Sequence, residues 1–300
     1  MPDPTLRLAL LQFAPLLGEL RPNLDRVLDG IRYAAAAGAA LVLAPEMCLT
    51  GWTLPDRAAR VRLADQTASV AVPALAEAAR QFSVTVVAGG PLPFSDAVAN
   101  CAIALSPSGH RAVHRKLHLF GPEATWWTRG DGVEVVATAR AVVGPLICYD
   151  GEFCEVPRML RLRGASLMAV AATNMSPYER DQDLIFATRA LENECVVAVC
   201  NRVGSEGDWH YFGRSLVADA RGNVVAQAGA GEEVLLAEVT PAAAEPDPAL
   251  SYITHRRPAI YRPICRGGRA FDFAAAPMTG RSGGRQPTGD TLTRQEEVRA

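Results

Sequence analysis

Residues 141–160 read AVVGPLICYDGEFCEVPRML, an apolar run that ends at a cysteine and passes through a short polar turn into a helical pattern. The run at 142–148 is continuously hydrophobic, which is typical of a strand buried on both faces. Residues 152–163 predict a helix that ends before Gly164. A strand, a sharp turn and a helix in this order indicate an α/β fold and place the Cys148 side chain at the bend, close to backbone N–H groups.

The same alternation extends to the rest of the chain. Short apolar runs closed by Gly, Pro or polar residues predict further strands at residues 6–13, 40–44, 84–88, 101–105, 167–172, 196–200, 215–218, 224–226 and 234–239. Helical patterns are found at residues 23–37, 73–82 and 179–194, the last with a predicted inner face of Leu184, Ile185, Thr188 and Leu191. Strand–helix alternation followed by hairpin-like pairs predicts a mixed sheet in an α/β protein.

The composition restricts the classes of function. Of 300 residues 49% are hydrophobic and 21% are charged, so a substantial buried core is expected. A formal net charge of -2 without any Lys/Arg block argues against a nucleic-acid partner. No apolar run reaches the roughly 18 residues of a membrane span. The N-terminus lacks a basic signal-peptide region and the seven cysteines form no CxxC pair, so a cytoplasmic location is expected.

The chain is expected to contain one structured domain and a tail. Residues 1–265 hold all the predicted strands and helices and are assigned to the domain. Residues 266–300 end in the Gly/Arg/Thr-rich segment RSGGRQPTGDTLTRQEEVRA, which lacks aliphatic periodicity. This C-terminal extension is therefore predicted to be largely disordered.

Three residues at or near the ends of apolar or extended segments can carry chemistry: Glu46 in LVLAPEMCLTGW, Lys116 in VHRKLHLFGPE and Cys148. Each also has an ordinary structural explanation. Glu46 can be a loop cap, Lys116 part of a solvated basic edge strand, and Cys148 an inert core cysteine. His114 and His118 have a spacing that can bind a metal, but the lysine between them would repel a cation, so no metal site is expected.

Together these side chains would form a set suited to thiol chemistry. A carboxylate in a partly dry pocket has a raised pKa and can take the proton of a thiol. A neighbouring ammonium would stabilise both the thiolate and the oxyanion that forms when it attacks an amide or nitrile carbon. The sequence has no phosphate loop, no dinucleotide-binding glycine motif and no HExxH. Acyl transfer through a thioester, with no cofactor, is the predicted chemistry.

The segments APEMCLTGW, HRKLHLFGPE and GPLICYDGEFCEVPR, in this order and spacing, resemble the nitrilase superfamily of carbon–nitrogen hydrolases. The flanks RALENECVVAVCNRVG, FGRSLVADARGNVVAQAG and HRRPAIY are similar too, so the resemblance covers residues 5–262. It implies a four-layer αββα sandwich that assembles through its helices into a homodimer or a higher homo-oligomer.

The resemblance also implies roles for individual residues. Glu46 would be the general base, Cys148 the nucleophile, and Lys116 the oxyanion stabiliser beside the backbone N–H of Tyr149. Glu123, in FGPEATWW, would position the lysine and the substrate amide. The implied reaction is attack on an amide carbon, release of ammonia, and hydrolysis of the thioester by water.

The segment AATNMSPYERDQD is most similar to the 5-aminopentanamidase-like aliphatic amidases. The implied substrate is a small aliphatic primary amide with an ω-amino or ω-guanidino group, bound by Tyr149, Asn174 and Met175. Trp52, where the family more often has Tyr, and Trp126 are expected at the pocket wall, with a core or interface position as the alternative for Trp126. The alternative functions are an N-carbamoyl amine amidohydrolase, a nitrilase and a catalytically inactive binding homologue.

Overall fold

The computed structural model describes residues 5–241 and 249–265. The chain divides into two units, one extending to Arg256 and a second that starts at Arg257. Within the described part of the second unit lie two short 3-10 helical turns, η3 (Pro258–Ile260) and η4 (Arg262–Cys265). The predicted extension at 266–300 lies outside the described residues. In the described ranges, no helix combines the length and the apolar character that a membrane span requires.

Two six-stranded sheets occupy the centre of the first unit. The first sheet has the order β14 (Glu233–Val239), β1 (Leu6–Gln12), β2 (Leu41–Leu43), β3 (Thr85–Phe94), β4 (Ala97–Leu105) and β5 (Arg111–Arg115). The second has the order β13 (Val224–Gln227), β12 (Leu216–Ala218), β9 (Val196–Asn201), β8 (Leu167–Ala172), β7 (Val142–Ile147) and β6 (Val136–Ala137). In each sheet the three consecutive strands β1–β2–β3 or β7–β8–β9 are parallel and the remaining pairings are antiparallel. A separate two-stranded ribbon pairs β10 (Val203–Glu206) with β11 (Trp209–Phe212).

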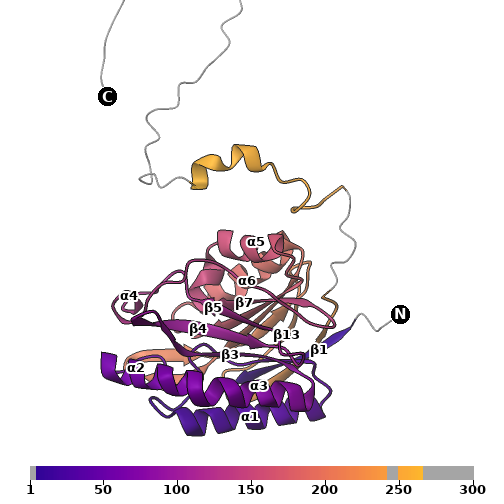
Figure 1. The fold of residues 1–300 in the computed structure, drawn as a ribbon. Coiled ribbons are helices and arrows are strands. Elements are labelled where there is room, and N and C mark those ends of the chain that lie inside the picture. Colours follow the sequence, from indigo (N-terminus) through magenta and orange to yellow (C-terminus); the bar gives the residue numbers. More distant parts are fainter. Residues whose placement is uncertain (1–4, 242–248, 266–300) are drawn as a thin grey trace, which may run out of the picture. The chain divides into compact units, whose positions relative to one another are not determined.

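Helices cover the outer face of each sheet (Figure 1). The layer on the first sheet contains α1 (Leu20–Ala36), α2 (Arg57–Gln66), the π-helical turn η1 (Thr67–Ala71) and α3 (Val72–Phe82). The layer on the second sheet contains α5 (Glu155–Leu162) and α6 (Glu179–Asn193). One further helix, α4 (Glu123–Trp126), is a single turn. The layers therefore follow the order αββα, which confirms the predicted sandwich.

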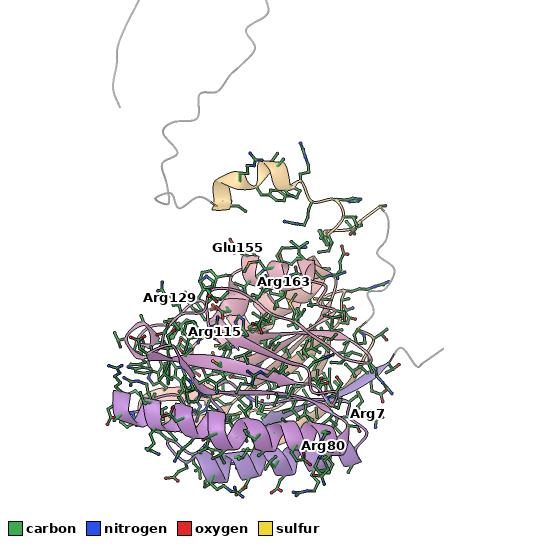
Figure 2. All side chains as sticks on the ribbon, in the orientation of Figure 1. Arg7, Arg80, Arg115, Arg129, Glu155 and Arg163 are labelled. Atoms are coloured by element: carbon green, nitrogen blue, oxygen red, sulfur yellow. The ribbon has the colours of Figure 1, made fainter. Side chains whose placement is uncertain are left out.

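Alternation along each strand decides which layer a side chain fills. In β1, Leu8 and Leu10 belong to the core between the two sheets, whereas Ala9 and Leu11 belong to the core under the helices. Because both faces of the sheets are buried, the strands appear in the sequence as continuous apolar runs. Charged side chains such as Arg80 on α3 remain on the outer surface (Figure 2).

The buried face of α6 differs from the predicted one. Leu184 and Leu191, which were expected inside, are 55% and 42% exposed, and Phe186 lies inside instead. The inner face also carries the amides Gln182 and Asn193. Each of these amides donates to a backbone carbonyl, which offsets the loss of water on burial. The apolar pattern alone does not reveal a helix face that is buried through hydrogen bonds.

Two helix starts differ from the predictions, and one helix was not predicted. The turn after the nucleophile strand is a 3-10 helix, η2 (Cys148–Glu152), and α5 begins only at Glu155 rather than at 152. Helix α1 begins at Leu20 rather than at 23, so Asn23 lies in its first turn and accepts from the backbone N–H of Leu16. Helix α2 was not predicted, since its sequence RAARVRLADQ has little apolar periodicity.

Candidate active site

The predicted catalytic residues meet where strands of both sheets end. Glu46 follows β2, Lys116 follows β5 and Cys148 follows β7. The carboxyl ends of strands are where α/β sheets form their ligand sites. The Nζ of Lys116 lies 2.8 Å from Oε1 of Glu46 and 2.7 Å from Oε2 of Glu123. All four side chains are buried, and Lys116 and Cys148 line the same pocket, so the structure brings these four residues together.

A pocket of about 280 Å³ opens onto the nucleophile. Its walls are formed by Trp52, Lys116, Phe120, Cys148, Tyr149, Glu152, Thr173, Asn174, Met175, Tyr178 and Asp181. Four of the five residues predicted to bind substrate are therefore in the wall, namely Trp52, Tyr149, Asn174 and Met175. Trp126 is not among the lining residues; its ring packs edge-on against Trp52, with the centroids 5.2 Å apart.

The nucleophile sits on a strained turn. Cys148 has a φ of 40°, a left-handed conformation that residues other than glycine rarely adopt. Arg189 of α6 holds the turn by donating to the backbone oxygens of Gly151 at 2.9 Å and Glu152 at 2.6 Å. A Cβ at position 151 would lie 2.4 Å from the ring of Phe186, so only glycine fits there. Arg189 and Gly151 therefore both support the turn that carries Cys148.

The surroundings of Cys148 favour the neutral thiol over the thiolate. Burial raises the pKa of Cys148 well above its usual value, and the charge of Glu46 raises it further, against the opposing effect of Lys116. Its Sγ donates to Oδ1 of Asn174 at 2.9 Å. Because only the thiolate is strongly nucleophilic, a base must remove this proton as the sulfur attacks.

Glu46, the predicted base, lies near enough to Cys148 for its charge to raise the pKa of the thiol. Its Oε1 accepts from Nζ of Lys116 at 2.8 Å and from Nδ2 of Asn100 at 2.6 Å. Its Oε2 accepts from Oγ1 of Thr173 at 2.6 Å. Burial raises the pKa of Glu46, Lys116 opposes this, and the charge of Glu123 adds to it. A carboxylate with a raised pKa is suited to proton transfer near neutral pH.

The backbone around Glu46 packs tightly against β3. A Cβ at Gly89 would lie 2.5 Å from the backbone O of Pro45 and 2.5 Å from the N of Met47. Met47 has a φ of 51°, so the chain bends sharply directly after Glu46. Glycine at position 89 is therefore what lets the Glu46 loop reach the site.

Lys116 is held as an ammonium. Burial on its own would lower the pKa of Lys116, but the carboxylates of Glu123 and Glu46 outweigh it and raise the pKa well above its usual value. An ammonium has three N–H donors, and the two glutamates use two of them. The third remains for an oxyanion in the pocket that Lys116 lines beside Cys148.

Two polar residues of this network were not predicted. Asn100, in β4, donates to both glutamates, since its Nδ2 also lies 3.2 Å from Oε1 of Glu123. The predicted strand at 101–105 begins one residue later and so excludes Asn100. Thr173 directly follows β8, and a polar residue after an apolar strand is the same sequence signal that marks Glu46 and Cys148.

Asp150 ties the nucleophile turn to the segment that carries Lys116. Its carboxylate accepts from the backbone N–H groups of Leu117 and His118. It also contacts the rings of His114 at 2.8 Å and His118 at 2.9 Å. Burial would raise the pKa of Asp150, but the hydrogen bonds from these two histidines outweigh it and hold the pKa well below its usual range. The two histidines are thus carboxylate partners, and Asp150 anchors the turn to the segment that carries Lys116.

Five further cysteines lie in surroundings that do not activate a thiol. Burial raises the pKa of three of them to about 12, namely Cys48, Cys101 and Cys195. Burial also raises the pKa of Cys200, well above its usual value. Cys154 is exposed at the start of α5, and its pKa is raised by partial burial and by Glu155. Neither Cys48 nor Cys154 lines the pocket of Cys148.

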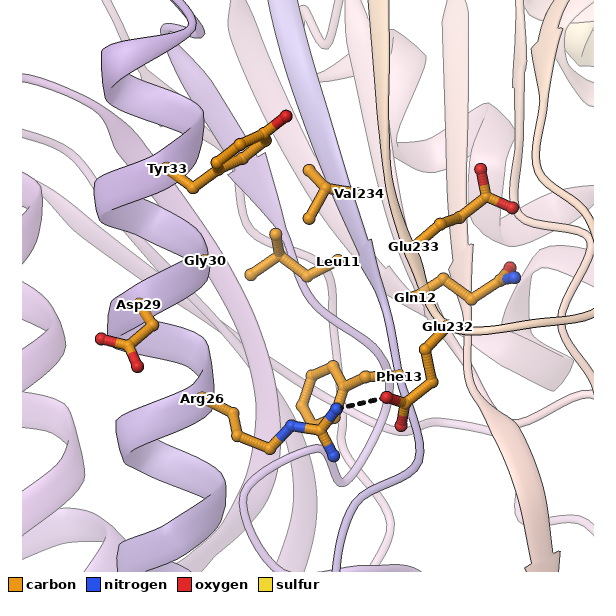
Figure 3. Close-up of a pocket in the computed structure, with 10 residues that line it drawn as sticks. All are labelled: Leu11, Gln12, Phe13, Arg26, Asp29, Gly30, Tyr33, Glu232, Glu233 and Val234. Carbon is orange, nitrogen blue, oxygen red and sulfur yellow. Dashed lines mark hydrogen bonds and ion pairs between the residues drawn. The ribbon is translucent and has the colours of Figure 1, made fainter.

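A second pocket, of about 360 Å³, lies between α1 and β14 (Figure 3). Its main cation, Arg26, pairs with Glu232 at 2.7 Å and lies 4.8 Å from the centroid of the Phe13 ring. Asp29 pairs with Arg32 at 2.6 Å. These charges are therefore partnered, and none of the predicted catalytic residues lines this pocket.

Taken together, the fold and the site define a hydrolase with a cysteine nucleophile, a carboxylate base and a fixed ammonium. The chain matches the family model described as carbon-nitrogen hydrolase over residues 7–249. It belongs to the carbon-nitrogen hydrolase family, as its resemblance to the nitrilase superfamily had implied.

Individual relatives include both nitrilases and amidases. A nitrilase of Pyrococcus abyssi is 32% identical over 236 residues, which cover 78% of this chain and 89% of that protein. An (R)-stereoselective amidase of Pseudomonas sp. is 32% identical over 76% of this chain and 82% of its own. An amidase structure from Nesterenkonia sp. matches with a TM-score of 0.77 and 26% identity, covering 86% of this chain and 96% of that one. A variant of that amidase, with the same TM-score and identity, carries the acetamide moiety of fluoroacetamide covalently on its active-site cysteine.

Proposed function

We propose that the protein hydrolyses a small aliphatic primary amide with a cationic end, an ω-amino or ω-guanidino amide, to a carboxylate and ammonia. The observation that carries this proposal is a pair of acidic residues, Glu152 and Asp181, in the wall of the Cys148 pocket. Burial raises the pKa of Glu152, and the charge of Asp181 raises it further, so the two carboxylates repel each other. A bound cation would relieve this repulsion.

The position of the pair suits the far end of a substrate. Asp181 is exposed and Glu152 is half-buried, whereas Cys148 is buried. An amide that reaches the sulfur would therefore direct its other end toward the two carboxylates. Apolar and aromatic side chains form the wall alongside them and can contact a methylene chain: Trp52, Phe120, Met175 and Tyr178.

The proposed reaction begins when Glu46 takes the thiol proton of Cys148 and the sulfur attacks the amide carbon. The oxyanion is stabilised by the ammonium of Lys116, which Glu123 orients, and by the backbone N–H of Tyr149. Glu46 then gives its proton to the nitrogen, the C–N bond breaks and ammonia leaves a thioester. Glu46 next takes a proton from water, whose oxygen attacks the thioester. The C–S bond breaks, the proton on Glu46 returns to the sulfur, and the product leaves as a carboxylic acid that loses its proton to water to give the carboxylate.

We further propose that the enzyme acts as a homodimer or a higher homo-oligomer in the cytoplasm, where reducing conditions keep its nucleophile a free thiol. Exposed apolar side chains on α5 and α6 support assembly through these helices. They are Met159, Leu162, Leu184 and Leu191. Apolar surface of this kind is typical of contacts between protein chains.

A substrate panel tests the proposal. Ammonia release is compared for 5-aminopentanamide, 4-guanidinobutanamide and uncharged hexanamide, with N-carbamoylputrescine and 3-phenylpropionitrile representing the alternative functions. We expect kcat/KM for the two cationic amides to exceed that for hexanamide by about tenfold or more, which corresponds to about 1.4 kcal/mol. A preference for hexanamide would contradict the cationic substrate, and turnover of the carbamoyl compound or nitrile alone would contradict the amidase.

A matched pair of variants tests the acidic pair itself. Asp181→Asn should lower kcat/KM for 5-aminopentanamide by about tenfold and leave hexanamide nearly unchanged. Asp183→Asn makes the same charge change on the same helix, but Asp183 pairs with Arg214 and does not line the pocket. Equal losses in the two variants, or equal losses for the two substrates, would rule out a specific role for Asp181.

A further inference from the structure

Gln182 fixes the direction of a hydrogen-bond chain that ends at the nucleophile. Its Nε2 donates to the backbone oxygen of Arg214 at 2.8 Å and, more distantly, to that of Gly213 at 3.5 Å. A backbone oxygen only accepts, so Gln182 must direct its amino group toward these oxygens and its Oε1 away from them. That Oε1 accepts from Nδ2 of Asn174 at 2.7 Å.

The same logic fixes the side chain of Asn174. Because its Nδ2 is bonded to Gln182, its Oδ1 faces Sγ of Cys148 at 2.9 Å. Turning the amide over would place two oxygens face to face in a site where Gln182 is 2% and Asn174 is 6% exposed. The backbone of Asn174 is held as well, since Asn201 accepts from its N–H at 2.7 Å and donates to its oxygen at 3.1 Å.

From the direction of these hydrogen bonds we propose that Gln182 is a positioning residue. It keeps the side-chain oxygen of Asn174 against the sulfur and so holds Cys148 as a thiol until a substrate is attacked. This inference rests on Cys148 being the nucleophile of the proposed function. An amide oxygen accepts from S–H and repels a thiolate, whereas a reversed amide would donate N–H to a thiolate and stabilise it. Burial and the charge of Glu46 act in the same direction, since both raise the pKa of Cys148.

The consequence is a nucleophile that is protected while the site is empty. Alkylation and oxidation act on the thiolate, so a cysteine held as S–H resists both. Deprotonation then depends on Glu46, whose own carboxylate already accepts from Lys116 and Thr173. The direction of the hydrogen bonds from Gln182 through Asn174 to Cys148 thus controls the resting reactivity of the sulfur, without any contact between Gln182 and the substrate.

The test is the pH dependence of Cys148 alkylation by iodoacetamide in the substrate-free, full-length protein, located by peptide mapping. Gln182→Met has a similar volume but no amide, so Asn174 can turn its amino group toward the sulfur. We expect the midpoint of the alkylation profile to fall by about one pH unit and the rate at pH 7 to rise about tenfold. A purely structural role would lower stability and leave the midpoint in place.

Three further variants make the result decisive. Gln182→Glu still accepts from Asn174 in either ionisation state, so its midpoint should not fall. Asn193→Leu removes another buried amide of α6 that contacts neither residue and should keep the parental midpoint. Asn174→Ala removes the acceptor and should lower the midpoint even if Gln182→Met does not fold.

An unchanged or raised midpoint in Gln182→Met or in Asn174→Ala would overturn the inference. A fall in Gln182→Glu or in Asn193→Leu equal to that in Gln182→Met would overturn it as well. Alkylation requires no turnover, so a failure of the amide panel would contradict the proposed function and leave this test unaffected.

Discussion

The Nζ of Lys116 lies 2.8 Å from Oε1 of Glu46, and the same ammonium is shared with Glu123. Two buried carboxylates and one ammonium leave one net negative charge in the site. Burial and this excess charge raise the pKa of Glu46 even though a cation is in contact with it. The arrangement therefore favours the uptake of one more proton, which is what a base for the Cys148 thiol must do.

Replacing the ammonium should damage both catalysis and stability. Lys116→Met removes the oxyanion donor, so kcat should fall by about 10²- to 10³-fold. It also leaves two buried carboxylates unpaired, which should lower the free energy of unfolding by about 3–5 kcal/mol. Ammonia release and urea unfolding measure the two effects.

The control for Lys116→Met is Arg115→Met at the neighbouring position. Arg115 pairs with Asp131, whose side chain is largely exposed. Arg115→Met should therefore lower the free energy of unfolding by less than about 1 kcal/mol and leave kcat at the parental value. Comparable activity in Lys116→Met and Arg115→Met would contradict the assigned role of the lysine.

The base should be visible in the pH profile. Because burial and Glu123 raise the pKa of Glu46, activity should fall on the acid side with a midpoint above the usual value of about 4.3 for a glutamate. As the pH drops through that raised pKa, Glu46 becomes protonated and can no longer take the thiol proton. Glu46→Gln should lower kcat by about 10²- to 10⁴-fold and remove this acid limb from kcat/KM. An acid limb that persists in the variant would belong to another group.

The parts of the site that could be predicted from sequence are those next to apolar strands. Glu46 and Cys148 follow continuous apolar runs, so their place at a sheet edge follows from local pattern. The stacking of two sheets did not follow from pattern, because strand partners lie far apart in the chain. Leu6 of β1, for example, pairs with Val239 of β14. That part of the fold was available only through the resemblance to a family.

Gln182 shows why other site residues could not be predicted. It is a polar residue in a helix, beside Asp181 and Asp183, and such a segment is typical of a solvated face. Its burial results from carbonyls about thirty residues further along the chain, at Gly213 and Arg214. A hydrogen bond to a distant loop leaves no periodic signal in the sequence, so only the tertiary structure identifies the residue.

Alanine substitution should distinguish the nucleophilic cysteine from the other cysteines by its effect on activity. Cys148→Ala should abolish ammonia release, because the thioester can no longer form. Cys48→Ala and Cys154→Ala should retain activity, since neither lines the pocket and burial raises the pKa of both thiols. Far-UV circular dichroism checks that each variant folds. An active Cys148→Ala together with an inactive Cys154→Ala would move the nucleophile to position 154.

Asp150 should link stability and catalysis. Asp150→Asn replaces one acceptor oxygen by an amino group that faces N–H donors. The free energy of unfolding should therefore fall by about 1–3 kcal/mol, and kcat should fall because the Lys116 segment loosens. Because the pKa of Asp150 is lowered in the folded protein, its ionised carboxylate stabilises the fold at pH values above the usual aspartate pKa. This contribution is lost as the pH falls toward the lowered pKa of the folded protein. The difference in unfolding free energy between parent and variant should therefore be constant near pH 7 and narrow below about pH 4. As a control, Asp219→Asn, in a surface turn, should leave kcat unchanged. If the difference in unfolding free energy between the parent and Asp150→Asn did not change with pH, the assigned ionisation of Asp150 would be contradicted.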